Sequence, residues 1–392
     1  MKDRHYILII SIALTLVGIV MVFSSSAVYA EALYANSFFF LKKELLWVMV
    51  GSLMLVISYN VNLKFLRKVS PYLFVLTLLL VLATYTSLGV KVGGAKRWIR
   101  MSGINFQPSE FLKFGVACIL GWYLSQEKLI KEKTFKDFCF CLFIIGIAAL
   151  SVLGQPDFGT SSLIGVVGFI IMFVAGINIR YLLSLFLFSI PLAYFFIVKF
   201  PYRLLRVISF LDPWEDPQGK SFQIIQSFLA IGRGKVTGVG LGESTQKLFY
   251  LPAAHTDFIF SILAEELGFV GAVSVILAFV ILAFFCIKIA MKSQNVFSYL
   301  LALSCILYIT IQAIFNIAVV TGSVPTKGIA LPFISFGGSS LALTLFAIGF
   351  IMNVSKQNES LKISVKQNAG VNQEDKLRRK IRRAKRFGLV SV

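Results

Sequence analysis

The chain has 392 residues, of which 57% are hydrophobic and 14% are charged, and 38 Lys and Arg against 18 Asp and Glu give a formal net charge of +20. A soluble domain carries about 25% charged residues, so this composition excludes an ordinary soluble enzyme. It indicates a polytopic membrane protein, whose basic residues are expected to meet membrane lipids and not a nucleic acid.

Apolar stretches long enough to cross about 30 Å of hydrocarbon, roughly 20 residues of helix, recur along the chain. They have the apolar density of helices and lack the alternation of barrel strands. We therefore expect an all-α polytopic integral membrane protein with about ten transmembrane helices. The expected spans are residues 6–29, 44–59, 71–89, 109–125, 137–153, 159–177, 181–198, 257–290, 298–321 and 334–354.

These spans define one membrane domain, residues 1–355, with a single large hydrophilic loop at 199–256 between the seventh and eighth spans. Within this loop, the apolar spacing of residues 222–231 predicts a short amphipathic helix. Residues 356–392 are expected to form a disordered basic tail, which holds eleven Lys and Arg. Because positive charge is retained in the cytoplasm, we expect both termini there and the large loop outside the cytoplasmic membrane.

Fifteen Lys and Arg nevertheless fall in the expected outer connections, where the positive-inside rule predicts few. One interpretation is a solvated face that contacts lipid headgroups. The other is a binding site for an anionic group such as a phosphate, because Arg and Lys side chains are suited to holding phosphates. The candidate cations are Arg97, Lys113, Arg203, Arg206, Lys247 and Lys327.

The eighth span opens with polar residues, in the sequence AAHTDFIFSILAEELGF at 253–269. The stretch from Asp257 to Lys288 is about 32 residues, or roughly 48 Å of continuous helix, which exceeds the bilayer core. We therefore expect Asp257 to lie on the outer side of the membrane, and Glu265 and Glu266 to pack against outer arginines. The alternative is that Asp257 only complements the helix dipole, which is worth under about 1 kcal/mol.

Three further outer connections carry unusual polar residues: RWIRMSGINFQPSEFLK at 97–113, GQPDFGTSS at 154–162 and GSVPTKGIALPFISFGGSS at 322–340. Each one alone is more simply a turn with a capping residue. Because all of them share one membrane face with the large loop, we interpret them together as a single outer site. Its further candidate residues are Trp98, Glu110, Asp157, Gln226, His255, Thr256 and Ser339.

These segments, together with FLDPWEDPQGKSFQIIQSFLAIGRGKVTGVGLGESTQKLFYLPAAHTDF at 210–258, resemble the SEDS polytopic glycosyltransferases of bacterial cell-wall synthesis. The similarity covers about residues 6–355, and the motifs follow in the family's order. DPW, QKLFYLP and EELGF resemble the division-associated branch more than the elongation-associated branch that governs cell shape. Two positions depart from the pattern, Ala253 where the family usually has Glu and Phe336 where it usually has Tyr.

The resemblance implies that the protein polymerises lipid II, the undecaprenyl-diphosphate-linked disaccharide pentapeptide, outside the cytoplasmic membrane at the division septum. The family's catalytic aspartate maps onto Asp257, which would act as general base while cations hold the leaving diphosphate. The implied partners are lipid II, a class B penicillin-binding protein transpeptidase and other divisome proteins.

Two alternatives and one cofactor question stay open. A lipid II flippase is one alternative, although uncharged interiors in several spans favour an outer site over a conduit. A non-catalytic division scaffold with a lipid-binding tail is the other. With two histidines and five cysteines in the chain, and Cys139 and Cys141 too closely spaced for a zinc pair, no resident metal is predicted. A Mg²⁺ or Mn²⁺ ion between Asp257 and the diphosphate stays possible.

Overall fold

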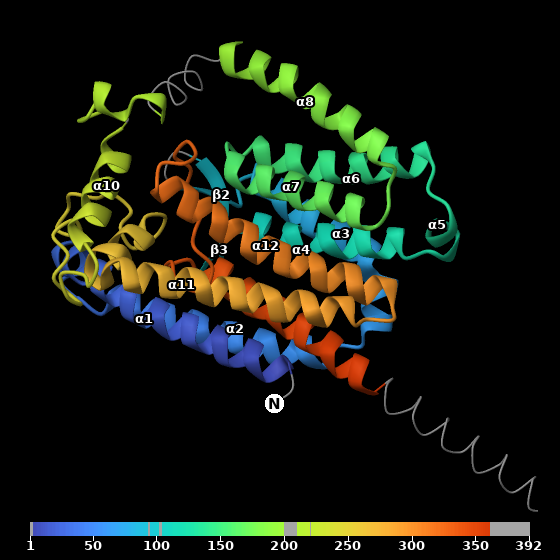
Figure 1. Cartoon of the computed structure of the whole chain (residues 1–392), viewed down its shortest axis with the longest axis horizontal. Coiled ribbons are helices and arrows are strands. Elements are labelled where there is room, and N and C mark those ends of the chain that lie inside the picture. The colour runs from blue at the N-terminus through green and yellow to red at the C-terminus, as the bar shows by residue number, and fades with distance from the viewer. Residues whose placement is uncertain (1–2, 93–94, 102–103, 200–209, 220, 361–392) are drawn as a thin grey trace, which may run out of the picture.

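The computed structural model describes residues 3–92, 95–101, 104–199, 210–219 and 221–360, and long helices dominate it (Figure 1). Each of the ten expected spans coincides with one long helix. These helices are α1 (Asp3–Tyr34), α2 (Phe39–Asn60), α3 (Leu63–Ala83), α4 (Pro108–Leu124), α6 (Phe135–Leu153), α7 (Phe158–Val174), α8 (Ile179–Lys199), α11 (Ile259–Met291), α12 (Val296–Val320) and the last helix (Gly338–Ser360).

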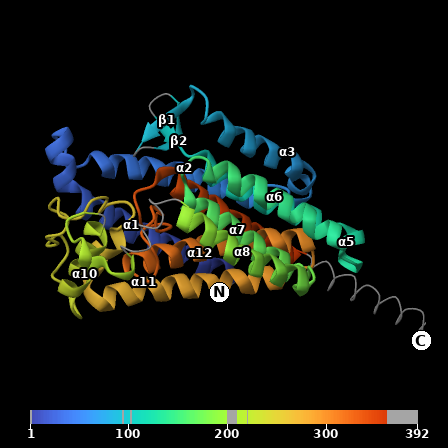
Figure 2. The same ribbon diagram turned by 90° about the horizontal axis from the view of Figure 1, so that it is seen from above.

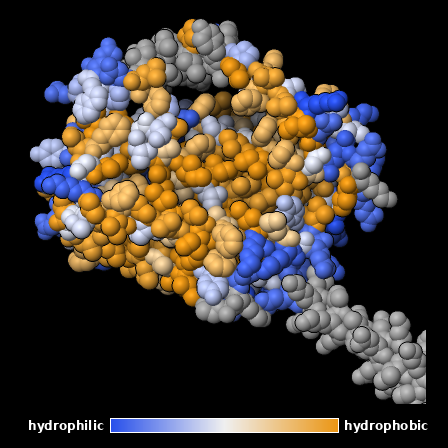
Figure 3. Space-filling model, viewed as in Figure 1, coloured by the Kyte–Doolittle hydropathy of each residue, from blue (hydrophilic) through white to orange (hydrophobic). Residues whose placement is uncertain are grey.

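The surface of the bundle is apolar around its middle. By length and composition, six of the described helices could cross a membrane, namely α1, α3, α6, α11, α12 and the last helix. Apolar side chains cover the centre of the face seen in Figure 3, and hydrophilic residues gather toward its two ends. Large exposed side chains such as Met49, Leu53 and Val280 would be unfavourable in water but are favourable against lipid. The fold is that of a multi-pass membrane protein.

The two termini of the described chain meet at one end of the bundle. Asp3 forms an ion pair with Lys288 at the end of α11, at 3.0 Å. Arg4 lies 3.5 Å from Glu359 in the last helix. This helix runs to Ser360, so residues 356–360 belong to it and not to a tail. The rest of the expected disordered tail, residues 361–392, lies outside the described residues.

At the opposite end, a small antiparallel sheet joins α3 to α4 (Figure 2). Its strands are β1 (Gly89–Val92), β2 (Ala95–Met101) and β3 (Ile104–Phe106), in the order β1-β2-β3. The expected all-α membrane fold is confirmed, and this small sheet in the connection between two helices is an element that the sequence did not predict. The signal is a short alternation in β2, where Ala95 and Ile99 are buried while Lys96 and Arg100 are exposed.

The large loop also folds at this end. It contains the short 3₁₀ helix η1 (Pro213–Glu215) and α10 (Phe222–Gly234), which confirms the amphipathic helix expected at 222–231. Ser227 of α10 lies 2.8 Å from Ser261 of α11, between their hydroxyl oxygens, and donates to the carbonyl oxygen of Val320 at the end of α12 at 2.7 Å. The loop is therefore packed onto the end of the bundle.

Helix α11 differs from the continuous helix that the sequence analysis expected. It begins at Ile259, and its N-cap is Phe258, whose side chain cannot accept a hydrogen bond. Asp257 therefore precedes the helix and does not cap it. The helix is also broken at Gly268, which has φ 69° and ψ −167°. At the break, the amide nitrogens of Val239 and Gly240 donate to the carbonyl oxygens of Glu265 and Glu266, at 3.0 and 3.1 Å.

Candidate functional site at the loop end of the bundle

The predicted outer segments come together at the end of the bundle that lies opposite the termini. They are β2, the first turns of α4 and α7, the turn at 251–258 before α11, and the loop at 321–337 between α12 and the last helix. Arg203 and Arg206, two of the candidate cations, lie outside the described residues.

Asp257 sits in a tight turn that is enclosed by the 321–337 loop. The amide nitrogens of Thr256 and Phe258 both donate to the carbonyl oxygen of Ala253, at 3.0 and 3.4 Å. Gly328 of the loop faces the carboxylate so closely that a Cβ there would lie 2.7 Å from Asp257 Oδ2. A side chain at position 328 would therefore displace the carboxylate or the loop.

The pKa of Asp257 is set by its burial and by two nearby charges of opposite sign. Its side chain is half-buried. Its pKa is raised to about 6, mainly by burial; the charge of Arg97 lowers the pKa and that of Asp157 raises it. The carboxylate is therefore ionised at neutral pH but has the basicity that proton abstraction near neutral pH requires.

Arg97 and Asp157 are both held by the segment between α6 and α7. Arg97 Nε donates to the carbonyl oxygen of Gln155 at 3.1 Å, and its terminal nitrogen donates to that of Pro156. Asp157 caps α7 by accepting from the amide nitrogen of Thr160 at 3.1 Å. The sequence motif at 154–162 is thus both a capped helix start and a support for Arg97, whose charge reaches Asp257.

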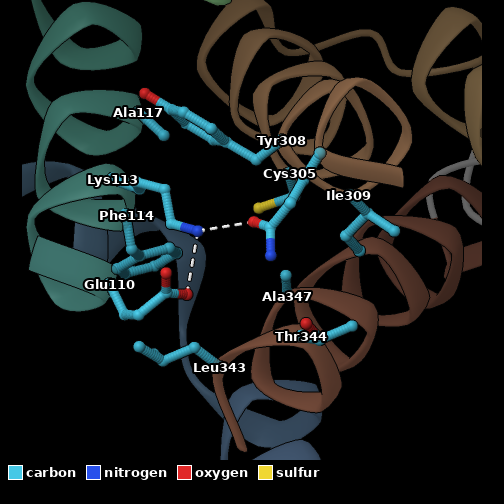
Figure 4. A pocket seen from close by; sticks show the side chains of 11 residues that line it. Glu110, Lys113, Phe114, Ala117, Cys305, Tyr308, Ile309, Leu343, Thr344 and Ala347 are labelled. Carbon is cyan, nitrogen blue, oxygen red and sulfur yellow. Dashed lines mark hydrogen bonds and ion pairs between the residues drawn. The ribbon is translucent and has the colours of Figure 1, made fainter. Parts of the chain in front are cut away.

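Glu110 and Lys113 point into the bundle. Lys113 Nζ lies 2.8 Å from Glu110 Oε2 and donates to Gln312 Oε1 at 2.8 Å (Figure 4). They line a cavity between α4, α12 and the last helix, and Tyr308 and Thr344 also contribute to its wall. Lys113 is thus neutralised by a buried carboxylate one turn away on the same helix.

Lys247 is likewise paired. It is buried, and its Nζ lies 2.9 Å from Glu266 Oε1, which also accepts from Ser24 of α1 at 2.6 Å. Glu265 accepts from Ser244 and lies 4.0 Å from Arg233 Nε. Glu265 thus lies near an arginine, as expected, whereas Glu266 pairs with a lysine instead. The pairs tie the glycine-rich loop to the broken part of α11.

His255 and Thr256 lie in the same turn as Asp257, and Ser339 lies in the first turn of the last helix. His255 packs against Phe40 with 4.6 Å between ring centroids, and burial lowers its pKa to about 4, so it is neutral at pH 7. The carbonyl oxygen of Thr256 accepts from Ser335 at 2.6 Å, and Ser339 accepts from the amide nitrogen of Gln107 at 3.1 Å.

Three more candidates lie at the rim of this end. Lys327 Nζ lies 3.9 Å from the ring centroid of Phe158. Trp98 of β2 and Gln226 of α10 are half-buried. Within the described residues, no group of three or more His, Cys, Asp or Glu side chains lies close enough to hold a metal ion.

Two residues that contact the site were not among the candidates predicted from the sequence. Asn316 donates to the carbonyl oxygen of Asp257, and Gln312 accepts from Lys113, both from α12. Their signal was present in the sequence, because polar side chains four residues apart in an apolar span are costly in hydrocarbon and usually face a partner.

This geometry defines a class: a multi-pass helical membrane protein with a charged site, built around a half-buried carboxylate, at one end of its bundle. The family model of FtsW, RodA and SpoVE, described as cell cycle protein, matches residues 4–360. The chain therefore belongs to this family, the SEDS proteins.

Curated relatives include a probable peptidoglycan glycosyltransferase FtsW of Geobacter sulfurreducens, 40% identical over 351 residues, which cover 89% of this chain and 94% of the relative. Stage V sporulation protein E of Bacillus subtilis is also 40% identical, with 89% of this chain and 96% of that protein covered.

Solved structures share the fold. One, described as showing structural coordination of polymerization and crosslinking by a peptidoglycan synthase complex, has a TM-score of 0.74 and 26% identity over 90% of this chain and 97% of that chain. The rod shape determining protein RodA of Thermus thermophilus has a TM-score of 0.67 at 22% identity, with 90% of this chain and 96% of that chain covered.

Proposed function

We propose that this protein is a peptidoglycan glycosyltransferase that polymerises lipid II into glycan strands during cell division. The names of its relatives support the class of reaction. The observation that carries the proposal is the carboxylate of Asp257, which is half-buried beside Arg97 and has a pKa of about 6. Such a group can remove a proton from a sugar hydroxyl at neutral pH.

In the proposed reaction, the 4-hydroxyl of an acceptor sugar attacks the anomeric carbon of a lipid-linked donor sugar. Asp257 takes the hydroxyl proton as the new C–O bond forms, which typically contributes about 10² to 10⁴ in rate. The bond from the anomeric carbon to the diphosphate oxygen breaks, and undecaprenyl diphosphate leaves with that electron pair. A single displacement predicts inversion at the anomeric carbon, by analogy with inverting hydrolysis.

The leaving diphosphate needs cations, and the structure divides the candidates. Lys113 and Lys247 already have buried carboxylate partners, Glu110 and Glu266. We assign the diphosphate to Arg97, whose charge acts on Asp257, because positive charge there would stabilise the developing negative charge. If the reaction uses Mg²⁺ or Mn²⁺, Asp257 would supply a carboxylate ligand and the ion would neutralise charge on the leaving diphosphate.

The orientation of the protein follows from its charges. Asp3 and Ser360 mark the end of the bundle that leads into the basic residues 361–392. The positive-inside rule places this end in the cytoplasm, and so places Asp257 at the outer face of the cytoplasmic membrane. Lipid II would bind there. The fold shared with a chain from a peptidoglycan synthase complex supports a class B penicillin-binding protein as partner at the division septum.

The test is polymerisation by purified protein. Lipid II is supplied in detergent, alone and with the partner transpeptidase, and long glycan is measured. Polymer from the wild type but not from Asp257→Asn supports the enzyme. Translocation of the lipid II headgroup in sealed vesicles that survives this substitution, without polymer, would establish the flippase instead. Failure of both activities in the presence of the partner would leave a scaffold.

A further inference from the structure

Helix α12 presents two buried amide side chains toward the site, and the reaction described above assigns neither of them a role. Asn316 and Gln312 are four residues apart, so they lie on one face of the helix. Asn316 is 1% exposed, and its Nδ2 donates to the carbonyl oxygens of Asp257 and Ile329, each at 2.7 Å. Carbonyl oxygens only accept, so only the NH₂ end of this amide can face them.

Gln312 lies one turn before Asn316 on α12 and contacts the same loop. Its Nε2 donates to the carbonyl oxygen of Ala330 at 2.9 Å and to Ser340 Oγ at 3.3 Å, while its Oε1 accepts from Lys113. Two consecutive carbonyl groups of the 321–337 loop are therefore fixed to α12. One of the two amides also holds the backbone of the residue that we propose as general base.

Both of the segments that α12 holds are strained. Ala253 in the turn before Asp257 has φ 59°, and Phe333 in the 321–337 loop has φ 65°. Residues with a side chain rarely adopt this left-handed conformation, and they keep it only when surrounding contacts impose it. Gly328, in the same loop as Phe333, packs directly against the Asp257 carboxylate. The position of Asp257 thus depends on contacts from outside its own turn.

We propose that Asn316 is a positioning residue: by holding the carbonyl groups of Asp257 and Ile329 together, and with Gln312 anchoring the loop beneath it, Asn316 sets the place of the Asp257 carboxylate. This inference rests on the proposed function. The charged groups that act on the carboxylate are Arg97 of β2 and Asp157 at the start of α7. Because the chemistry depends on distance, a displacement of about 1 Å can cost 10²-fold in rate.

The chain contains a matched control. Asn353 in the last helix is 8% exposed, and its Nδ2 also donates to two carbonyl oxygens, those of Ser58 at 2.8 Å and Val61 at 2.7 Å. These contacts join α2 to the last helix at the end of the bundle that carries the termini. Leu is close to Asn in shape, so Asn316→Leu and Asn353→Leu remove the same pair of bonds at opposite ends of the protein.

The experiment measures steady-state polymerisation of lipid II by the wild type and these two variants, per mole of folded protein, from about pH 5 to pH 9. Asn316→Leu is expected to lower kcat by about 10- to 100-fold while KM changes by less than about 3-fold. The acid limb of its pH–rate profile, where activity falls as Asp257 becomes protonated, should move to lower pH by about 1 unit. The reason is that Asp257 is better hydrated once it is released from this contact. Asn353→Leu should unfold at a lower temperature yet keep kcat and the acid limb.

Equal kcat values and acid limbs in Asn316→Leu and Asn353→Leu would overturn the inference, because a merely structural amide lowers the amount of folded enzyme and leaves its pH profile unchanged. If Asn316→Leu does not fold, Asn316→Ser keeps one O–H donor and should show a smaller displacement in the same direction; an unmoved limb there also overturns the inference. A silent wild type, or an active Asp257→Asn variant, would refute the proposed function itself.

Discussion

The raised pKa of Asp257 has a cost in folding free energy at neutral pH. The pKa is about 6 in the folded protein, against an ordinary value of 3.8. Each pKa unit corresponds to 1.36 kcal/mol, so ionising Asp257 in the folded state costs about 3 kcal/mol at pH 7.5. Between these two pKa values the folded state binds more protons than the unfolded state, so stability is lost as pH rises through about 6.

The substitution Asp257→Asn removes this cost while keeping the size of the side chain. We expect the variant to have no polymerase activity and to be more stable than the wild type by up to about 3 kcal/mol at pH 7.5, and by about 1 kcal/mol at pH 4.5, where the folded wild type is protonated. The assay is reversible unfolding in mixed detergents, followed by intrinsic fluorescence at both pH values. Glu215→Gln, which alters an exposed carboxylate, is the control and should change neither value.

An Asp257→Asn variant no more stable than the wild type at pH 7.5 would refute this reasoning. So would a gain of equal size at both pH values, because a difference that ignores pH cannot come from a titrating group. In either case the carboxylate would be well hydrated, and its role as a base of raised pKa would lose its physical basis. A stabilised and inactive variant would show that stability is given up for function at this position.

Three further predictions concern the neighbours of this carboxylate. Arg97→Gln removes the charge that lowers the pKa of Asp257, so the acid limb of kcat should move to higher pH; a limb that stays in place contradicts the assigned contact. Gly328→Ala places a Cβ 2.7 Å from Asp257 Oδ2 and should lower kcat about 10- to 100-fold with unchanged expression, as polymer yield over time would show. Lys113→Met leaves Glu110 buried without its cation and should destabilise the fold by about 3–5 kcal/mol, whereas adding Glu110→Gln should restore most of that loss in the same unfolding assay.

The transmembrane architecture could be predicted from the sequence because each span must satisfy its backbone internally and cover about 30 Å with apolar side chains. This constraint acts on every residue of a span, so it appears as a long signal. The sheet at 89–106 gave no such signal. Its strands are short, and half of the residues in β2 from Ala95 to Arg100 are basic, which the sequence analysis interpreted only as a cationic cluster.

The break in α11 shows a second limit of prediction. EELGF at 265–269 is compatible with a continuous helix, since a single Gly inside a helix costs only about 1 kcal/mol. The break depends on distant partners: Phe269 and Val270 donate to the carbonyl oxygens of Lys235 and Val236, at 2.9 and 3.2 Å. A pairing between segments about 30 residues apart has no local pattern, so it could be found only from the three-dimensional structure.

The sequence predicted that these charged residues lie at one end of the bundle, but it did not show which groups they contact. The outer cations were interpreted either as a solvated face or as phosphate ligands, because the positive-inside rule leaves them unexplained. The structure supplies another reason for three of them, since Lys113, Lys247 and Arg233 each pair with a buried glutamate. A cation paired in this way cannot hold a diphosphate without leaving a carboxylate buried and unpaired, which is strongly unfavourable. Under the proposed function, we therefore expect Arg97, whose charge acts on Asp257, to contact the diphosphate, while the glutamates of the EELGF motif stabilise the loop that borders them.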